Sequence, residues 1–274
     1  MRRAAGARGE MAQITASSVA QDAGHPGPTL LQRFRRDQPW WLLPLSVVTV
    51  LGGFGLYALV SVFVFRPGEI GPYLSPFWSP KIGDNGKLFG PFPGAAFILL
   101  SPLAFRGSCY YYRKAYYRSF FLDPPACALG ELRHRRYRGE AKLPMALNNL
   151  HRFTLYVAVV ILGFLWYDAL IAFNNPADGR WGLGLGTAIL LVNVVLLSGY
   201  TFSCHSLRHL AGGGLDCYST ARLGNARHRA WRWLTALNVR HPMWAWVSLF
   251  SVLLADVYIR MLQAGWFVDP HMGF

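Results

Sequence analysis

The chain has 274 residues, of which 53% are hydrophobic and only 15% charged, and its formal net charge is +14. Such a composition is typical of an integral membrane protein. The basic residues flank long apolar segments and form no separate soluble domain, so they are interpreted as topology signals. A nucleic-acid-binding function is therefore excluded, although the charge alone would be compatible with one.

Five long segments are uncharged or nearly so. They cover residues 40–65, 91–105, 151–173, 181–203 and 242–267. Crossing the hydrocarbon core takes about 20 helical residues, and a closed barrel is the other structure that satisfies the backbone there. These segments are too long and too uniform for alternating barrel strands. We predict an all-α fold, a bundle of five transmembrane helices within residues 36–274, preceded by a mobile tail over residues 1–35.

The distribution of positive charge predicts the orientation of this bundle. Arginine and lysine are dense in the N-terminal tail, in residues 113–142 and in residues 208–240. The alternate connections hold few basic residues, namely Arg66, Lys81, Lys87 and Arg180. Cytoplasmic loops carry the excess of positive charge, which predicts an inner N-terminus and an outer C-terminus. The polar stretch after Arg3 does not resemble a cleavable signal.

The inner ends of two spans are expected to extend beyond the membrane as helices. No helix breaker follows Gly107, so the second span is predicted to continue through Arg106 to about residue 121. The fourth span is predicted to leave the membrane near Cys204 and to run to the glycines at 212–214, which are a strong stop signal.

Three charged residues fall in the outer halves of the predicted spans: Asp168, Asp256 and Arg260. Charges at this depth are costly unless they are paired or face a polar interior. Asp256 and Arg260 lie four residues apart, on one helix face. We expect an ion cluster that holds the third and fifth spans together; the alternative is a polar path for protons or a second ligand pocket near the outer surface.

Thiols and imidazoles gather at the inner ends of the spans, and His241 precedes the last span at the same level. Six of them form the candidate set of metal ligands, of which at most four can bind: Cys109, Cys127, His151, Cys204, His205 and His209. Any one of these residues, taken alone, is better explained as a small apolar cysteine or as a histidine at the membrane interface. Their number at one depth favours a redox metal site.

Three kinds of metal centre use these donors. Two facing histidines would hold a b-type haem. Two thiolates and two imidazoles would hold a Rieske-type [2Fe–2S] cluster, although the usual spacing of Cys-x-His with Cys-x-x-His is absent. Zinc accepts the same ligands. A pair of haems across the membrane is excluded, because no histidine lies in the outer half of a span.

Four short motifs resemble a known family. They are SCYYYRKAYYR at 108–118, PPAC at 124–127, NLHR at 149–152 and CHSLRH at 204–209. They are similar to the membrane-anchor (cytochrome b-type) subunit of actinobacterial succinate dehydrogenases. The resemblance implies a subunit of the plasma membrane, in contact with membrane lipid, that fixes a flavoprotein and an iron–sulfur subunit to the inner face. It also implies electron delivery from succinate to menaquinone.

Succinate oxidation itself is not expected on this chain, which has no dinucleotide fingerprint. Quinone carbonyls need hydrogen-bond donors beside an apolar cleft, and position alone suggests Arg106, Tyr111, Arg208 and Trp231. Two other functions stay open at this point. One is a haem b quinol-oxidising anchor of another respiratory complex; the other is a small transporter, which the absence of repeats disfavours.

Overall fold

The computed structural model describes residues 39, 41–82, 87–89, 92–120, 145–174, 181–213, 215 and 217–273. The chain divides into two compact units, residues 1–43 and 44–274, and every site below belongs to the second. The predicted tail of residues 1–35 lies outside the described residues, and so does Cys127.

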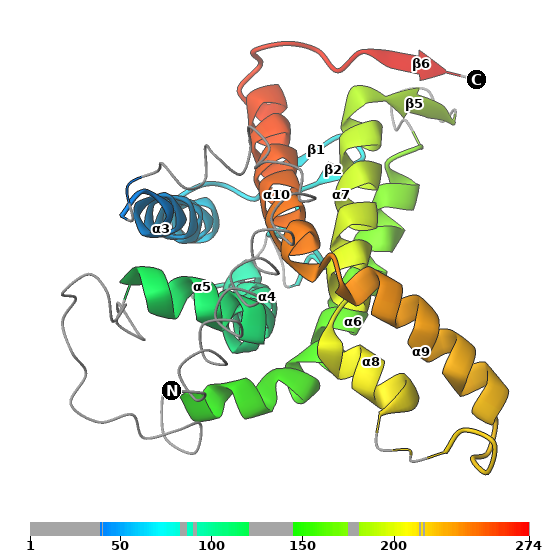
Figure 1. The fold of residues 1–274 in the computed structure, drawn as a ribbon. Helices are drawn as coiled ribbons and strands as arrows, with labels where there is room; N and C mark the ends of the chain where they lie inside the picture. Colours follow the sequence, from blue (N-terminus) through cyan, green and yellow to red (C-terminus); the bar gives the residue numbers. More distant parts are fainter. Residues whose placement is uncertain are drawn as a thin grey trace, which may run out of the picture. The chain divides into compact units, whose positions relative to one another are not determined.

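The fold is helical, as predicted, and most of the helices are apolar (Figure 1). Among the described residues, four segments are long and apolar enough to cross a membrane: α3 (Leu42–Phe63), Asn148–Ile171 with α6 (His151–Ile171), α7 (Leu185–Phe202) and α10 (His241–Gln263). A fifth apolar helix, α4 (Gly94–Ser108), has 15 residues, or about 22 Å at 1.5 Å per residue. Five crossings and the orientation stay predictions.

Four of the helices pack side by side in the order α10, α7, α6 and α4. Helix α10 packs along α7, α7 against α6, and α6 against α4. Small residues allow close approach: a Cβ atom on Gly199 of α7 would lie 2.5 Å from the Trp244 ring of α10. Interfaces between membrane helices are enriched in such small residues, because helices in lipid associate by close packing.

The outer faces of these helices expose large apolar side chains. Leu56, Leu103 and Val160 are 64%, 63% and 59% exposed. Contiguous apolar surface of this kind is rare on soluble monomers and marks contact with lipid or protein. This surface agrees with a membrane-embedded bundle.

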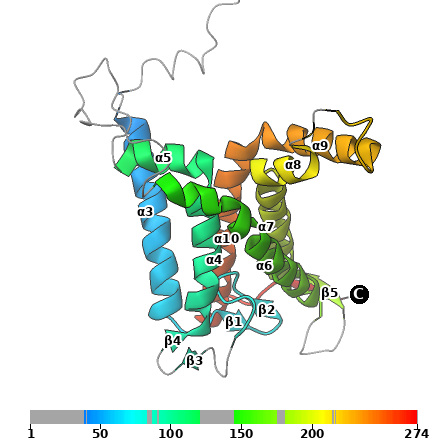
Figure 2. The same ribbon diagram turned by 90° about the horizontal axis from the view of Figure 1, so that it is seen from below.

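Two helices that the sequence predicts as continuous are broken at a cysteine. Helix α4 ends at Ser108, Cys109 is extended (φ −67°, ψ 130°), and α5 (Tyr110–Phe120) follows. Helix α7 ends at Phe202, Cys204 is extended (φ −62°, ψ 134°), and α8 (His205–Gly212) follows. The prediction of unbroken helices was wrong at both places. Figure 2 shows α5 and α8 running across the direction of the spans at the same end of the bundle.

Short elements complete the described fold. Helix α9 (Gly224–Asn238) packs on α8, and a 3-10 helix, η1 (Met145–Leu150), leads into α6. Three antiparallel two-stranded ribbons lie at the ends of the spans away from the cysteines. They are β1 (Glu69–Ile70) with β2 (Tyr73–Leu74), β3 (Lys87–Phe89) with β4 (Phe92–Pro93), and β5 (Gly182–Gly184) with β6 (His271–Gly273).

Candidate metal centre

Two cysteines and two histidines lie, as two contacting pairs, where four helices end or begin. Cys109 follows α4, His151 begins α6, Cys204 follows α7 and His241 begins α10. Their exposed fractions are 1%, 1%, 0% and 7%. Since the four helices alternate in direction, these ends are brought to one level, and the result is a buried set of two thiols and two imidazoles.

Each imidazole contacts one thiol through Nε2. His151 Nε2 lies 3.0 Å from Cys204 Sγ, and His241 Nε2 lies 3.4 Å from Cys109 Sγ. The first contact therefore joins the start of α6 to the break after α7, and the second joins the start of α10 to the break after α4. These distances are within the range of thiol–imidazole hydrogen bonds and within reach of a shared ligand.

The serines that come directly before Cys109 and Cys204 determine the tautomers of the two histidines. Ser108 Oγ donates to the Ala104 carbonyl (2.6 Å) and lies 3.0 Å from His151 Nδ1. Ser203 Oγ donates to the Tyr200 carbonyl (3.0 Å) and lies 2.7 Å from His241 Nδ1. A hydroxyl has one hydrogen to donate, so each serine accepts from its histidine. Nδ1 is therefore protonated in both rings, and each Nε2 lone pair faces a thiol.

An aromatic ring stacks on each of the two imidazoles. Phe105 stacks on His151 with ring centroids 4.8 Å apart, and Tyr200 stacks on His241 at 5.1 Å. Phe105 and Tyr200 meet edge to face at 5.4 Å. This packing supports each imidazole beside the thiol that it contacts.

His205 is a third imidazole near the centre. The donor atoms of His151, Cys204 and His205 all lie within 4.8 Å of one another, and His205 is the least buried of the three. Its ring stacks on His151 at 5.6 Å. Burial lowers the pKa of His205, and electrostatic repulsion from the nearby His209 lowers it further. His205 is therefore neutral near pH 7, the form that binds metals.

Burial makes both thiols weak acids. It raises the pKa of Cys204 to about 11 and also raises that of Cys109. Thiols of this kind stay protonated at neutral pH unless a metal ion replaces the proton, because coordination requires the thiolate. The two cysteines are thus unreactive by themselves and suited to a bound metal.

The structure brings together only part of the predicted ligand set. Cys109, His151, Cys204 and His205 lie at the centre, while His209 is exposed and receives a contact from Arg152 (3.3 Å). His241 lies at the centre but was not among the predicted ligands. Its position at the start of the last span, level with the others, was the signal that could have identified it.

Two of the predicted quinone residues lie beside this centre: the Tyr111 ring meets that of His241 edge to face at 6.4 Å, and Arg106 lies on α4. The Arg106 guanidinium donates to the Tyr112 hydroxyl (2.5 Å), the Ala245 carbonyl (3.0 Å) and Ser248 Oγ (2.8 Å). It also lies over the Tyr200 ring, 4.4 Å from the centroid. The positive charge is thus held beside the ring that stacks on His241.

Tyr111, Arg208 and Trp231 lie on other elements than Arg106. The Tyr111 hydroxyl accepts from Trp246 Nε1 at 2.7 Å. Arg208, on α8, donates to Thr235 at 2.9 Å and lies 5.0 Å from the Trp231 ring centroid on α9. Arg208 and Trp231 therefore contribute to the packing of α8 on α9.

A mainly apolar cleft opens between α4, α6 and α7 next to the centre. Its lining residues are Ser101, Pro102, Phe105, Arg106, Ala158, Ile161, Leu162, Leu165, Leu197, Tyr200 and Thr201. The buried hydroxyl of Ser101 has no hydrogen-bond partner within the described chain. Phe105 and Tyr200, which stack on the two histidines, form part of its wall.

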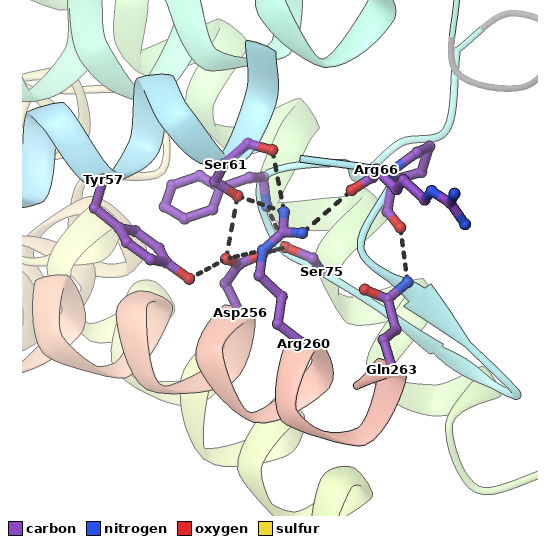
Figure 3. Close-up of polar contacts among 9 residues, drawn as sticks. Tyr57, Ser61, Arg66, Ser75, Asp256, Arg260 and Gln263 are labelled. Carbon is purple, nitrogen blue, oxygen red and sulfur yellow. Dashed lines mark hydrogen bonds and ion pairs between the residues drawn. The ribbon is translucent and has the colours of Figure 1, made fainter. Parts of the chain in front are cut away.

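A second polar cluster lies at the other end of α10 (Figure 3). The fully buried Asp256 carboxylate accepts from Tyr57 (2.5 Å), Ser61 (3.1 Å), Ser75 and Arg260 Nε (2.9 Å). These donors come from α3, the segment after it and α10. The cluster therefore joins α10 to α3.

Part of the predicted ion cluster was wrong. Arg260 also donates to the Ser61 and Arg66 carbonyls at 3.1 and 3.2 Å, which completes its pairing. Asp168 instead accepts from Ser79, so it is not shown to pair with Arg260. The expected charge link between the third and fifth spans is absent among the described residues, because the loop after α3 supplies each carboxylate with hydroxyl donors.

Fold and site together define a multi-span membrane protein with a buried Cys/His donor set at one end of its helices. The model of a family described as actinobacterial succinate dehydrogenase subunit SdhC matches residues 42–265. The chain belongs to this family of membrane-anchor subunits, which confirms the resemblance seen in its motifs.

A solved structure gives the same relationship. A chain in the Mycobacterium smegmatis Sdh1 complex in the apo form is 37% identical, with a TM-score of 0.77. The match covers 91% of this chain and 96% of that one. No match is found among curated proteins.

Proposed function

We propose that this chain anchors a succinate dehydrogenase complex in the plasma membrane and passes electrons from an iron–sulfur partner subunit to menaquinone. The family and the likeness to a chain of a whole Sdh1 complex support a flavoprotein and an iron–sulfur subunit as partners. The buried set of Cys109, His151, Cys204 and His241 is the observation that carries the electron-transfer part.

The donor set matches a Rieske-type [2Fe–2S] cluster in type and number. Such a cluster takes two thiolates on one iron and two imidazoles on the other. Cys109, Cys204, His151 and His241 would hold it, with His205 as the alternative imidazole. When bound, the cluster accepts and releases one electron at a potential of roughly −150 to +300 mV.

The surrounding side chains support such a centre in two ways. Ser108 and Ser203 accept the Nδ1 hydrogens, which orients both rings and leaves Nε2 free for the metal. Burial excludes water from the donors, and solvent exclusion controls the potential of a metal centre.

The donor types favour this cluster over the alternatives. Haem b takes axial imidazoles and would leave the two thiols of the set, on Cys109 and Cys204, without a role. Zinc would fit the donors but carries no electron. A transporter based on Asp256 is disfavoured, because that carboxylate is already saturated by four donors.

For the quinone we propose the cleft between α4, α6 and α7. Its apolar walls suit an isoprenoid quinone, and its free hydroxyl at Ser101 can donate to a quinone carbonyl. Arg106 adds positive charge at the end nearest His241. Five crossings, with the Cys/His end at the cytoplasmic face, would place this cleft beside the incoming electrons.

Recovery of the tagged chain from its own membranes tests the anchor function. The purified sample should contain two further subunits, flavin and iron, and should reduce a menaquinone analogue when succinate is added. Isolation of the chain alone from membranes that retain this activity would contradict the proposal.

Ser101→Ala should raise the KM for the quinone about 2- to 10-fold, the expected loss of one neutral hydrogen bond. Iron content and succinate oxidation with a soluble acceptor should not change. Ser219→Ala, in the exposed loop before α9, is the matched control and should leave the KM unaltered. An unchanged KM in Ser101→Ala would place the quinone elsewhere.

Ser203→Ala should weaken retention of the metal centre by about 10- to 100-fold, because loss of an outer-shell partner leaves His241 free to rotate. Iron retained during incubation with a chelator measures this effect. Ser203→Thr keeps the hydroxyl and should restore retention. Equal retention in all three proteins would contradict a role of Ser203 in orienting His241 as a ligand.

A further inference from the structure

Helix α9 has a fixed orientation on α8. Arg227 Nε donates to the Ala211 carbonyl at 3.0 Å, and Arg208 of α8 donates to Thr235. A Cβ atom on Gly212 would lie 2.7 Å from Trp231 Cβ, so the two helices are in close contact. One face of α9, including the buried Leu234, is thus covered by its neighbours.

The remaining surface of α9 has an apolar and a basic side. Ala226, Ala230 and Trp233 follow one another at helical spacing, all are exposed, and Trp233 is 58% exposed. Arg229 and Arg232 lie three residues apart on the adjacent exposed side, without an ion-pair partner among the described residues. The sequence from 217 to 240 contains no acidic residue.

The end of α9 is tied to a membrane span. Only Val239 and Arg240 separate it from α10, which begins at His241 and is long and apolar enough to cross the bilayer. Figures 1 and 2 show α9 running across the direction of α10. If α10 crosses the bilayer, a helix that joins its end and runs across its direction must lie along the membrane surface.

We propose that α9 is an interfacial helix that binds anionic phospholipid. Trp233 and the two alanines enter the boundary of the acyl chains, while Arg229 and Arg232 bind headgroup phosphates. Arginine on one side and tryptophan on the other is the pattern of helices that lie in the interface. Basic segments next to a span attract anionic lipid by charge. Lipid is favoured over a soluble partner because the link to α10 holds α9 at the bilayer. The proposal is independent of electron transfer.

Tryptophan quenching in nanodiscs tests this directly. The whole complex is reconstituted in equimolar phosphatidylcholine and phosphatidylglycerol, with brominated acyl chains on one lipid or on the other. The difference between the wild type and Trp233→Phe isolates the signal of Trp233. We expect this signal to be quenched, and quenched more by brominated phosphatidylglycerol.

The double variant Arg229→Gln/Arg232→Gln should quench equally with either brominated lipid. Arg66→Gln, which removes an exposed arginine after α3, is the matched control and should keep the preference. Absence of any quenching that depends on Trp233 would mean that a protein subunit covers α9. Equal quenching by both lipids in the wild type would show that the helix has no anionic preference. Either result overturns the proposal.

Discussion

Cys204→Ser should strongly reduce quinone-linked succinate oxidation while succinate oxidation with a soluble acceptor persists. Cys204 is completely buried and contacts His151 Nε2. Because burial keeps water away from this position, no water molecule can replace its thiolate as a ligand. Serine oxygen is a poor replacement for a thiolate that binds iron. Activity with a menaquinone analogue should fall by at least about tenfold, the effect of more than about 1.4 kcal/mol on the barrier. Iron and acid-labile sulfide should fall with it.

Cys217→Ser is the matched control for this variant. Cys217 is a free, exposed cysteine outside the centre, and its thiol is hydrogen-bonded to the Ser219 hydroxyl. Its replacement should leave iron content and both activities at the level of the wild type. Full quinone-linked activity in Cys204→Ser would show that electrons reach the quinone without this centre.

Asp256→Ala should produce the largest loss of stability in the described bundle. The change leaves Arg260 without its carboxylate and removes the acceptor of Tyr57, Ser61 and Ser75. Breaking a buried ion pair by removing one partner costs about 3–5 kcal/mol. The midpoint of thermal unfolding of the purified complex should fall, and α3 should become more accessible to proteases.

Glu69→Gln is the comparison for this effect. It removes the ion pair between Glu69 and Lys81, whose side chains are 43% and 46% exposed. Exposed pairs contribute about 0–1 kcal/mol, so the unfolding midpoint should hardly move. Equal midpoints for the Asp256→Ala and Glu69→Gln complexes would show that the buried cluster does not hold α3 to α10.

Much of the helical fold follows from hydrophobic length alone. The apolar segments predicted at 151–173 and 242–267 correspond to α6 and α10 within a few residues. Long uniform segments leave the backbone no other way to bond internally in lipid. The meeting of thiols and imidazoles at one end follows from the alternating direction of the helices.

The helix breaks could not be predicted, because they depend on contacts between distant segments. Neither Cys109 nor Cys204 is a helix breaker by propensity. Each is extended in the structure, and its thiol is buried against a histidine from another helix. The role of His241 depends in the same way on Ser203 and Cys109, which lie 38 and 132 residues away in the sequence.

The cluster around Asp256 shows a second feature that the sequence could predict only in part. The spacing of Asp256 and Arg260 was enough to predict their ion pair, since residues four apart share a helix face. The sequence could not show that hydroxyls from the loop after α3 would serve Asp256 and Asp168 separately. Ser75 and Ser79 are ordinary loop residues until the fold brings them to the carboxylates.

Electron paramagnetic resonance of the reduced complex, prepared with and without ¹⁵N-labelled histidine, is the most direct measurement. A cluster held by Cys109, Cys204 and two histidines should give a signal whose nitrogen couplings change with the label, and Cys204→Ser should remove that signal. A wild-type complex that shows iron–sulfur signals without histidine couplings, or the same signals after Cys204→Ser, would contradict a metal centre at these helix ends.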